Sequence, residues 1–139
     1  MARKTERKKL IDKLDKVCAK VVKERDDWTC QRCDKPVKGR NAHWSHIVSR
    51  EDHYLRWDLL NSILLCYQCH RWWHSASEGV KWFREKFKAR GEYLYGGCVD
   101  PNDGIVKAQN KITYKFSEDE LTELLGELEE NLTELQEGR

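Results

Sequence analysis

Two Cys-x-x-Cys pairs constrain the folding of this chain more than any other feature of its sequence. Cys30 and Cys33 form the first pair, and Cys66 and Cys69 form the second about thirty residues later. A two-residue gap lets one turn present both sulfurs, and four thiolates are a common ligand set for a structural zinc ion. A redox role would need a thioredoxin-like βαβ context, which the sequence does not indicate. We therefore expect one four-cysteine zinc site that joins two distant segments of the chain.

The distribution of charge divides the 139-residue chain into a basic body and an acidic end. Residues 1–90 carry 22 Lys and Arg against 12 Asp and Glu, a net charge of +10, whereas residues 91–139 carry 4 against 12, a net charge of −8. A basic body indicates a polyanionic partner. No window approaches about 18 consecutive apolar residues, and no apolar stretch follows the basic first residues. We expect no membrane span and no secretory signal, and hence a cytoplasmic protein without a disulfide framework.

Turn-forming residues and hydrophobic periodicity divide the chain into four expected segments. These are a basic N-terminal helix in residues 1–26, a zinc-containing core in 27–95, a turn-rich linker in 96–116 and an acidic C-terminal helix in 117–139. Both terminal helices are amphipathic, with apolar residues at helical spacing on one face. The last helix starts at a capping box formed by Ser117 and Glu120. Its leucine stripe must be covered by the basic first helix, by a second copy of the chain or by another protein.

Within the expected core, the pattern predicts a short strand, then an apolar segment, and then helices. The expected elements, in chain order, are a zinc knuckle at Trp28–Arg40, a short strand at Asn41–Val48, a polar loop at Ser49–Asp58, an apolar segment at Leu59–Leu65, and helices at Tyr67–Ser75 and Glu78–Ala89.

All five histidines of the chain lie around the cysteine pairs, at positions 43, 46, 53, 70 and 74. His70 and His74 are four residues apart on one expected helix and are therefore neighbours in space. Clustered imidazoles would support hydrolysis of a phosphodiester, which needs a general base for water, a divalent cation and a group that orients the base. The alternative is a structural or surface role for individual histidines, His53 above all.

The order and spacing of four residues resemble the HNH, or ββα-metal, nuclease family. His46 is followed by Asn61 after fifteen residues, by His70 after nine more and by His74 after a further four. Two cysteine pairs bracket this motif, as they do in the zinc-containing branch of the family. The resemblance covers residues 28–75. It implies an α+β fold with a small ββα-metal core, held together by the four-cysteine zinc site and extended by the two amphipathic helices.

A narrower resemblance rests on two short segments. His46–Arg50 reads His-Ile-Val-Ser-Arg, and Arg56–Asp58 reads Arg-Trp-Asp before the Asn. This pattern is similar to the phage NinG (Rap) recombination proteins, which act on branched DNA. It implies a role in phage recombination, replication or packaging.

The family resemblance also implies a role for each residue of the motif. His46 would be the general base that takes a proton from the attacking water, and the carbonyl of Asn61 would hold its other ring nitrogen. His70 and His74 would bind the catalytic cation, Mg²⁺ or Mn²⁺, which would stabilise the departing 3′-oxygen. Two imidazole ligands would also admit Ni²⁺ or Zn²⁺. The products would carry 5′-phosphate and 3′-hydroxyl ends.

Two positions depart from the resemblance. Many family members place Asp or His immediately before the base, as a further cation ligand, whereas this chain has Ser45. A hydroxyl is a weak ligand, so either water completes the shell or His43, two residues earlier on the same strand face, takes its place. Asp52 and His53 in the loop are further candidates. NinG-type proteins usually follow the second cysteine pair with Asn, whereas this chain has His70.

We expect the basic body to contact DNA through arginines near the motif. Arg50, Arg56 and Arg71 are the candidates, since a guanidinium binds a phosphate with two parallel hydrogen bonds. Arg50 or Arg56 would otherwise pair with a nearby Asp. The sequence thus predicts a metal-dependent DNA endonuclease of the HNH class. The alternative is a non-catalytic, zinc-containing protein that binds nucleic acid or recruits a partner, and the acidic C-terminal helix is the expected surface for a protein partner or a homodimer.

Overall fold

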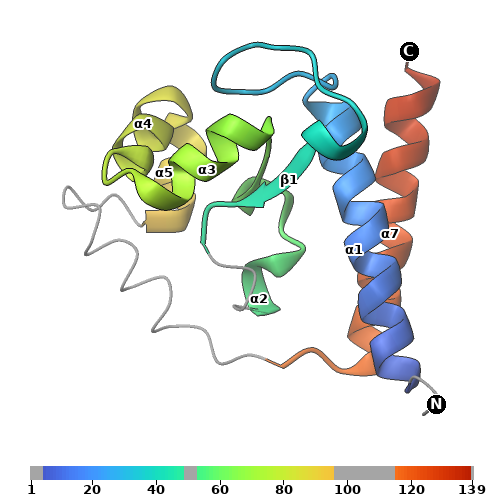
Figure 1. Cartoon of the computed structure of the whole chain (residues 1–139). Helices are drawn as coiled ribbons and strands as arrows, with labels where there is room; N and C mark the ends of the chain where they lie inside the picture. The colour runs from blue at the N-terminus through green and yellow to red at the C-terminus, as the bar shows by residue number, and fades with distance from the viewer. Residues whose placement is uncertain (1–4, 49–52, 96–114, 139) are drawn as a thin grey trace.

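The computed structural model describes residues 5–48, 53–95 and 115–138, which form an α+β fold and confirm the predicted class (Figure 1). In chain order its elements are α1 (Glu6–Arg25), the 3₁₀ turn η1 (Gly39–Asn41), β1 (His43–His46), α2 (His53–Arg56), the 3₁₀ turn η2 (Leu59–Asn61), β2 (Ser62–Leu65), α3 (Tyr67–Ser75), α4 (Gly79–Lys86), α5 (Lys88–Tyr95) and α7 (Glu118–Glu137).

The centre of the fold is a ββα unit made of β1, β2 and α3. The two strands are antiparallel, with His43 opposite Leu65 and His46 opposite Ser62. All four residues of β2 are buried, which fits the continuous apolar run in its sequence. Cys66 is both the residue after β2 and the N-cap of α3, so the strand leads directly into the helix. The unit therefore brings the side chains of β1 and the first turns of α3 together.

The C-terminal end of α1 is tied to β2 by a buried ion pair. The Arg25 guanidinium binds the Asp26 carboxylate at 2.9 Å and also donates to the carbonyls of Leu59 (2.6 Å) and Ser62 (2.7 Å). Asp26 in turn accepts from the backbone N–H of Leu64 at 2.9 Å. Each polar group of the buried pair is thus hydrogen-bonded, as burial requires. These contacts fix the first helix against the sheet.

The two terminal helices pack side by side and run in the same direction (Figure 1). Leu14 and Cys18 of α1 share a buried cluster with Leu121, Leu125 and Leu128 of α7. Near the start of both helices, the Arg7 side chain donates to the carbonyl of Phe116 at 2.6 Å. The predicted capping box of α7 is present at Ser117 and Glu120. Of the three candidate surfaces for the leucine stripe, the structure places it on the basic first helix.

Three local details differ from the sequence-based expectation. The expected loop at 49–58 contains the short helix α2, whose four residues are too few to give a periodic signal. The expected strand at 41–48 is shorter, because η1 precedes it. The expected helix at 78–89 is two helices, separated at Phe87, where the backbone turns out of the helical region.

Gly91 explains why α5 was missed. Glycine usually marks a turn in a sequence, but Gly91 lies buried inside α5. A Cβ at this position would stand 3.2 Å from the Cα of Arg84 in α4, so the missing side chain allows the two helices to approach closely.

No helix in the described part of the chain is long and apolar enough to cross a membrane. The division into segments 1–26, 27–95, 96–116 and 117–139 stays a prediction, and most of the expected linker lies outside the described residues.

Replacing Leu121 with Ala should lower the free energy of unfolding by about 2–4 kcal/mol, because the fully buried side chain leaves a cavity between α1 and α7. Glu129→Ala, at an exposed position of the same helix, should change it by less than about 0.5 kcal/mol. Urea denaturation of both variants measures the difference. Equal losses would show that α7 is not packed as described.

Candidate metal centre and active site

The four cysteines of the two pairs come together in the structure. The Sγ atoms of Cys30, Cys33, Cys66 and Cys69 all lie within 4.8 Å of one another, and those of Cys33 and Cys66 are 3.8 Å apart. In a regular tetrahedron with Zn–S bonds of about 2.3 Å, neighbouring sulfurs lie about 3.8 Å apart. The donor set and its spacing therefore fit a structural zinc ion. Within the described ranges, this is the one group of three or more His, Cys, Asp or Glu residues whose ligand atoms all lie this close to one another.

Local backbone geometry presents the sulfurs of both pairs. In the first pair, the chain reverses through Asp34, whose φ of 62° is in the left-handed region that Asp tolerates better than most residues. Backbone hydrogen bonds from Cys30 N to Lys35 O (2.8 Å) and from Asp34 N to Cys30 O (2.9 Å) close this turn. In the second pair, Cys66 caps α3, and its Sγ accepts from the N–H of Cys69 at 3.4 Å.

The cluster cannot hold four negative charges without a cation. Burial opposes ionisation of Cys30, but hydrogen bonds from neighbouring backbone N–H groups outweigh it and lower its pKa to about 7. Burial raises the pKa of Cys69 to about 12, although Arg32 donates to its sulfur at 3.4 Å. One thiolate thus forms readily near neutral pH, and a bound divalent cation would stabilise the others.

Three of the five histidines form a second group beside the cysteines. His43 of β1 and His70 of α3 approach through their Nδ1 atoms at 2.9 Å. His70 and His74, one turn apart on α3, approach through their Nε2 atoms at 3.0 Å. Burial, and then repulsion from the other two imidazoles, lowers the pKa of His70 to about 4. His70 is therefore neutral at physiological pH, which is the form that binds metal ions.

The spacing of His70 and His74 suits two ligands of one cation. Two nitrogens that bind one ion at about 2.1 Å and at right angles lie about 3.0 Å apart. Their Nε2 atoms have this separation. His74 is exposed and His70 is half-buried, so the pair is accessible from solvent.

His46 lies on the other face of β1 from His43, because side chains alternate along a strand. Its ring stacks at a tilt against Trp44, with the centroids 4.4 Å apart. Its Nε2 lies 3.0 Å from the carbonyl oxygen of Arg56. The family resemblance implied that a carbonyl of Asn61 would contact this ring, whereas the carbonyl at Nε2 belongs to Arg56. Because a carbonyl only accepts, Nε2 carries the hydrogen and Nδ1 carries the lone pair of the neutral ring.

Asn61 holds the loop between the strands. It is fully buried, and its Oδ1 accepts from the N–H of Val48 at 2.8 Å. Its Nδ2 donates to the carbonyls of Val48 (3.0 Å) and Leu55 (3.1 Å). Its own carbonyl accepts from the N–H of Ile47, the residue after His46. Asn61 therefore binds the backbone directly after His46, at Ile47 and Val48, and the backbone of Leu55 further along the loop.

The side chain of Ser45, the residue that departs from the family pattern, is hydrogen-bonded within its own strand. Ser45 is 1% exposed, and its hydroxyl donates to the carbonyl of His43 at 3.1 Å. The structure thus favours water or His43 over Ser45 beside the histidine pair. The remaining candidates, Asp52 and the side chain of His53, lie outside the described residues.

The three candidate arginines differ in their surroundings. The Arg56 guanidinium binds the Asp15 carboxylate of α1 with two hydrogen bonds, of 3.0 and 2.6 Å, and is only 14% exposed. This favours a structural role for Arg56. Arg71 is exposed on α3, with its guanidinium 5.7 Å from the centre of the Tyr67 ring. Arg50 lies outside the described residues.

Sequence reasoning missed two residues that support the site. Asp15 binds Arg56 and also accepts from the indole N–H of Trp57 at 2.8 Å. Nothing in the sequence set it apart from the other acidic residues of α1. Arg32 lies between the first two cysteines and stacks on Trp72 of α3, 3.7 Å from the ring centre. Its position inside a cysteine pair was a usable signal.

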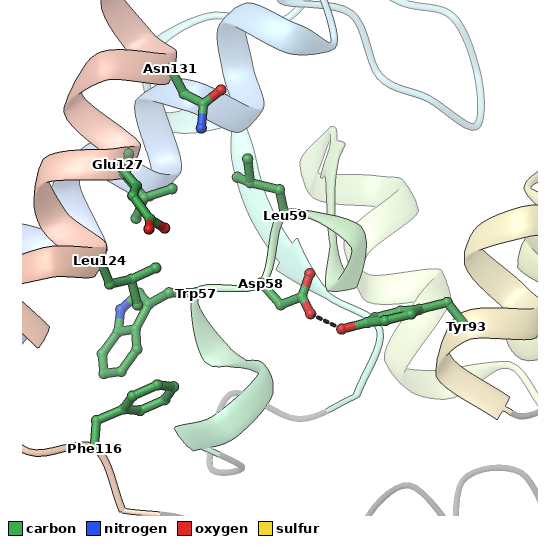
Figure 2. A pocket seen from close by; sticks show the side chains of 9 residues that line it. Trp57, Asp58, Leu59, Tyr93, Phe116, Leu124, Glu127 and Asn131 are labelled. Carbon is green, nitrogen blue, oxygen red and sulfur yellow. Dashed lines mark hydrogen bonds between the residues drawn. The ribbon is translucent and has the colours of Figure 1, made fainter. Parts of the chain in front are cut away.

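A cavity of about 410 Å³ lies away from the histidines, between α7 and the η2 and α5 segments (Figure 2). Trp57, Phe116 and Leu124 form its apolar side, and the Tyr93 hydroxyl donates to the Asp58 carboxylate at its edge. The described residues that line it include none of the candidate site residues.

Comparison with known families identifies the segment that holds the site. Residues 30–75 match the family model of the HNH endonuclease. The match spans the four cysteines, the ββα unit and the histidines of β1 and α3. No curated protein and no solved structure gives a significant match to the chain. Residues 30–75 are thus similar to an HNH endonuclease domain, and they carry a ββα unit and a four-cysteine cluster that fits zinc.

Replacing Cys66 with Ala should abolish stoichiometric zinc binding and lower the unfolding temperature, because metal-binding energy contributes directly to folding. Cys18→Ala is the matched control: Cys18 is fully buried but outside the cluster, so this variant should keep one zinc per chain and lose only about 1 kcal/mol. Elemental analysis and thermal unfolding measure both effects. Retention of one tightly bound zinc by Cys66→Ala would contradict the assignment.

Proposed function

We propose that this protein is a metal-dependent DNA endonuclease that hydrolyses phosphodiester bonds. The observation that carries the proposal is the match of residues 30–75 to the HNH endonuclease family, in a segment whose ββα unit holds His70 and His74 at the spacing of two cation ligands. The net charge of +10 over residues 1–90 supports a polyanionic substrate.

His46 is the proposed general base. Its Nε2 donates to the Arg56 carbonyl at 3.0 Å, so the lone pair on Nδ1 would accept the proton of the attacking water. Asn61 supports this role indirectly, because it fixes Val48 and Leu55 at the two ends of the adjoining loop. These hydrogen bonds restrain the backbone that follows His46.

His70 and His74 are the proposed ligands of the catalytic cation. When bound, a divalent cation would supply charge stabilisation at the phosphorus and at the departing 3′-oxygen. Two imidazole ligands favour Mn²⁺, Ni²⁺ or Zn²⁺ over Mg²⁺. Water would complete the shell, since Ser45 is buried and a hydroxyl is a weak ligand. The products would carry 5′-phosphate and 3′-hydroxyl ends.

Arg71 is the proposed phosphate contact within the described residues, because it is exposed on the same helix as His70 and His74. The likeness of His46–Arg50 to NinG-type proteins supports branched DNA as a substrate to compare with linear and supercoiled duplexes. The acidic face of α7 lies opposite the leucines that pack on α1. It is the proposed surface for a protein partner or a second copy of the chain.

A second candidate function is a zinc-containing module that binds nucleic acid without cutting it. The observation that favours it is Ser45, which is buried and occupied by a backbone carbonyl where many relatives have a cation ligand. Such a module would bind DNA with a strong salt dependence, because phosphate contacts release counterions. It would show no cleavage with any divalent cation.

His46→Ala should reduce the rate of plasmid nicking in Mn²⁺ by about 100-fold or more, because it removes the proposed general base. Zinc content should stay at one per chain. Ser75→Ala is the control, since its exposed hydroxyl bonds only to carbonyls of α3. The assay compares supercoiled, linear and four-way-junction DNA.

Cleavage by His46→Ala at the parental rate would exclude this residue as the base. If the parent itself binds DNA but cuts none of the three substrates in Mn²⁺, Ni²⁺ or Mg²⁺, the non-catalytic function is correct instead.

A further inference from the structure

A chain of three close contacts runs from a backbone carbonyl through the histidine group. The carbonyl of Arg40 lies 2.9 Å from His43 Nε2, and His43 Nδ1 lies 2.9 Å from His70 Nδ1. His70 Nε2 then lies 3.0 Å from His74 Nε2. Both ring nitrogens of His43 and both of His70 therefore take part in these contacts.

The carbonyl at one end of this series of contacts determines which nitrogen donates at each of them. A carbonyl oxygen only accepts, so His43 Nε2 must carry a hydrogen and donate it. In a neutral imidazole the other nitrogen, Nδ1, is then an acceptor. The hydrogen between the two rings therefore belongs to His70 Nδ1. This leaves the lone pair of His70 on Nε2, facing His74.

We propose that His43 is a positioning residue that fixes the tautomer of His70, so that Nε2 of His70 is presented to a cation shared with His74. This inference rests on the proposed cation site and deepens it. His43 is not itself a ligand in this arrangement, because it contacts Nδ1 of His70, whereas His74 lies at Nε2, and these two nitrogens point away from each other. Outer partners of this kind orient metal-binding histidines in many sites.

Packing supports a fixed ring at position 43. Its imidazole meets the His70 ring edge-on at a centroid distance of 5.1 Å and the Tyr67 ring at 5.7 Å. Both neighbours belong to α3, while His43 begins β1. The strand therefore sets the orientation of a side chain on the following helix.

The first test reads the tautomer directly in the zinc-loaded full chain. Long-range ¹H–¹⁵N correlation spectra should show His70 protonated at Nδ1 and unprotonated at Nε2. In His43→Leu, which removes the acceptor, His70 should shift toward the Nε2-protonated form that is preferred in water. In His43→Asn, whose Oδ1 replaces the acceptor at the same distance along the side chain, the Nδ1-protonated form should return.

The second test measures cation binding without activity. Titration of the zinc-loaded chain with Mn²⁺, followed by the electron paramagnetic resonance signal of free Mn²⁺, should give a Kd about 10-fold or more weaker in His43→Leu. His43→Asn should recover most of the affinity. Arg40→Ala keeps the backbone carbonyl and should bind Mn²⁺ as the parent does.

The proposal is overturned if His70 is protonated at Nε2 in the parent, or if its tautomer is the same in the parent and in His43→Leu. Mn²⁺ affinity unchanged in His43→Leu would also overturn it. These outcomes are distinguishable from failure of the endonuclease proposal, because the tautomer and the Kd are read on protein that has been given no DNA. Absence of Mn²⁺ binding in the parent would remove the cation from both proposals.

Discussion

The four-cysteine cluster is the contact on which the rest of the structure depends. It joins the turn at Cys30 and Cys33 to the start of α3, across more than thirty residues of chain. Closing a loop of this length costs conformational entropy that a two-stranded sheet cannot offset alone. Because Cys66 is also the N-cap of α3, the same residue fixes the helix direction. The first turns of α3, and with them His70, are therefore placed by the four-cysteine cluster.

The parts of the fold that could be predicted are those with a local chemical signature. The cysteine spacing, the apolar run of β2 and the capping box of α7 each specify structure over a few residues, and each is present. Helix α5 was missed because Gly91 resembles a turn signal, whereas its function is to let α5 approach Arg84. Trp28, a residue type that is mostly buried on average, is 36% exposed, and its indole N–H donates to Glu24.

The candidate site was predicted by residue type but not by contact. Spacing brought His70 and His74 together correctly, because helical periodicity fixes their separation. Spacing could not say that His43 would meet His70, since that contact depends on how β1 lies against α3. Nor could it say that the carbonyl beside His46 belongs to Arg56, because a backbone group has no signature in the sequence. Contacts between elements, rather than within them, set the hydrogen-bonding directions.

The terminal helices extend this argument from the sheet to the whole chain. Asp15 of α1 binds the Arg56 guanidinium, and the carbonyl of that same residue accepts from His46. Asp15 faces this loop because α1 is held on one side by Arg25 and on the other by the leucines of α7. The helices outside residues 30–75 thus support the orientation of the proposed base. The contribution of α7 is indirect, because it acts through its packing on α1. A chain reduced to the matched segment would lose the carboxylate that holds Arg56, and with it a constraint on His46.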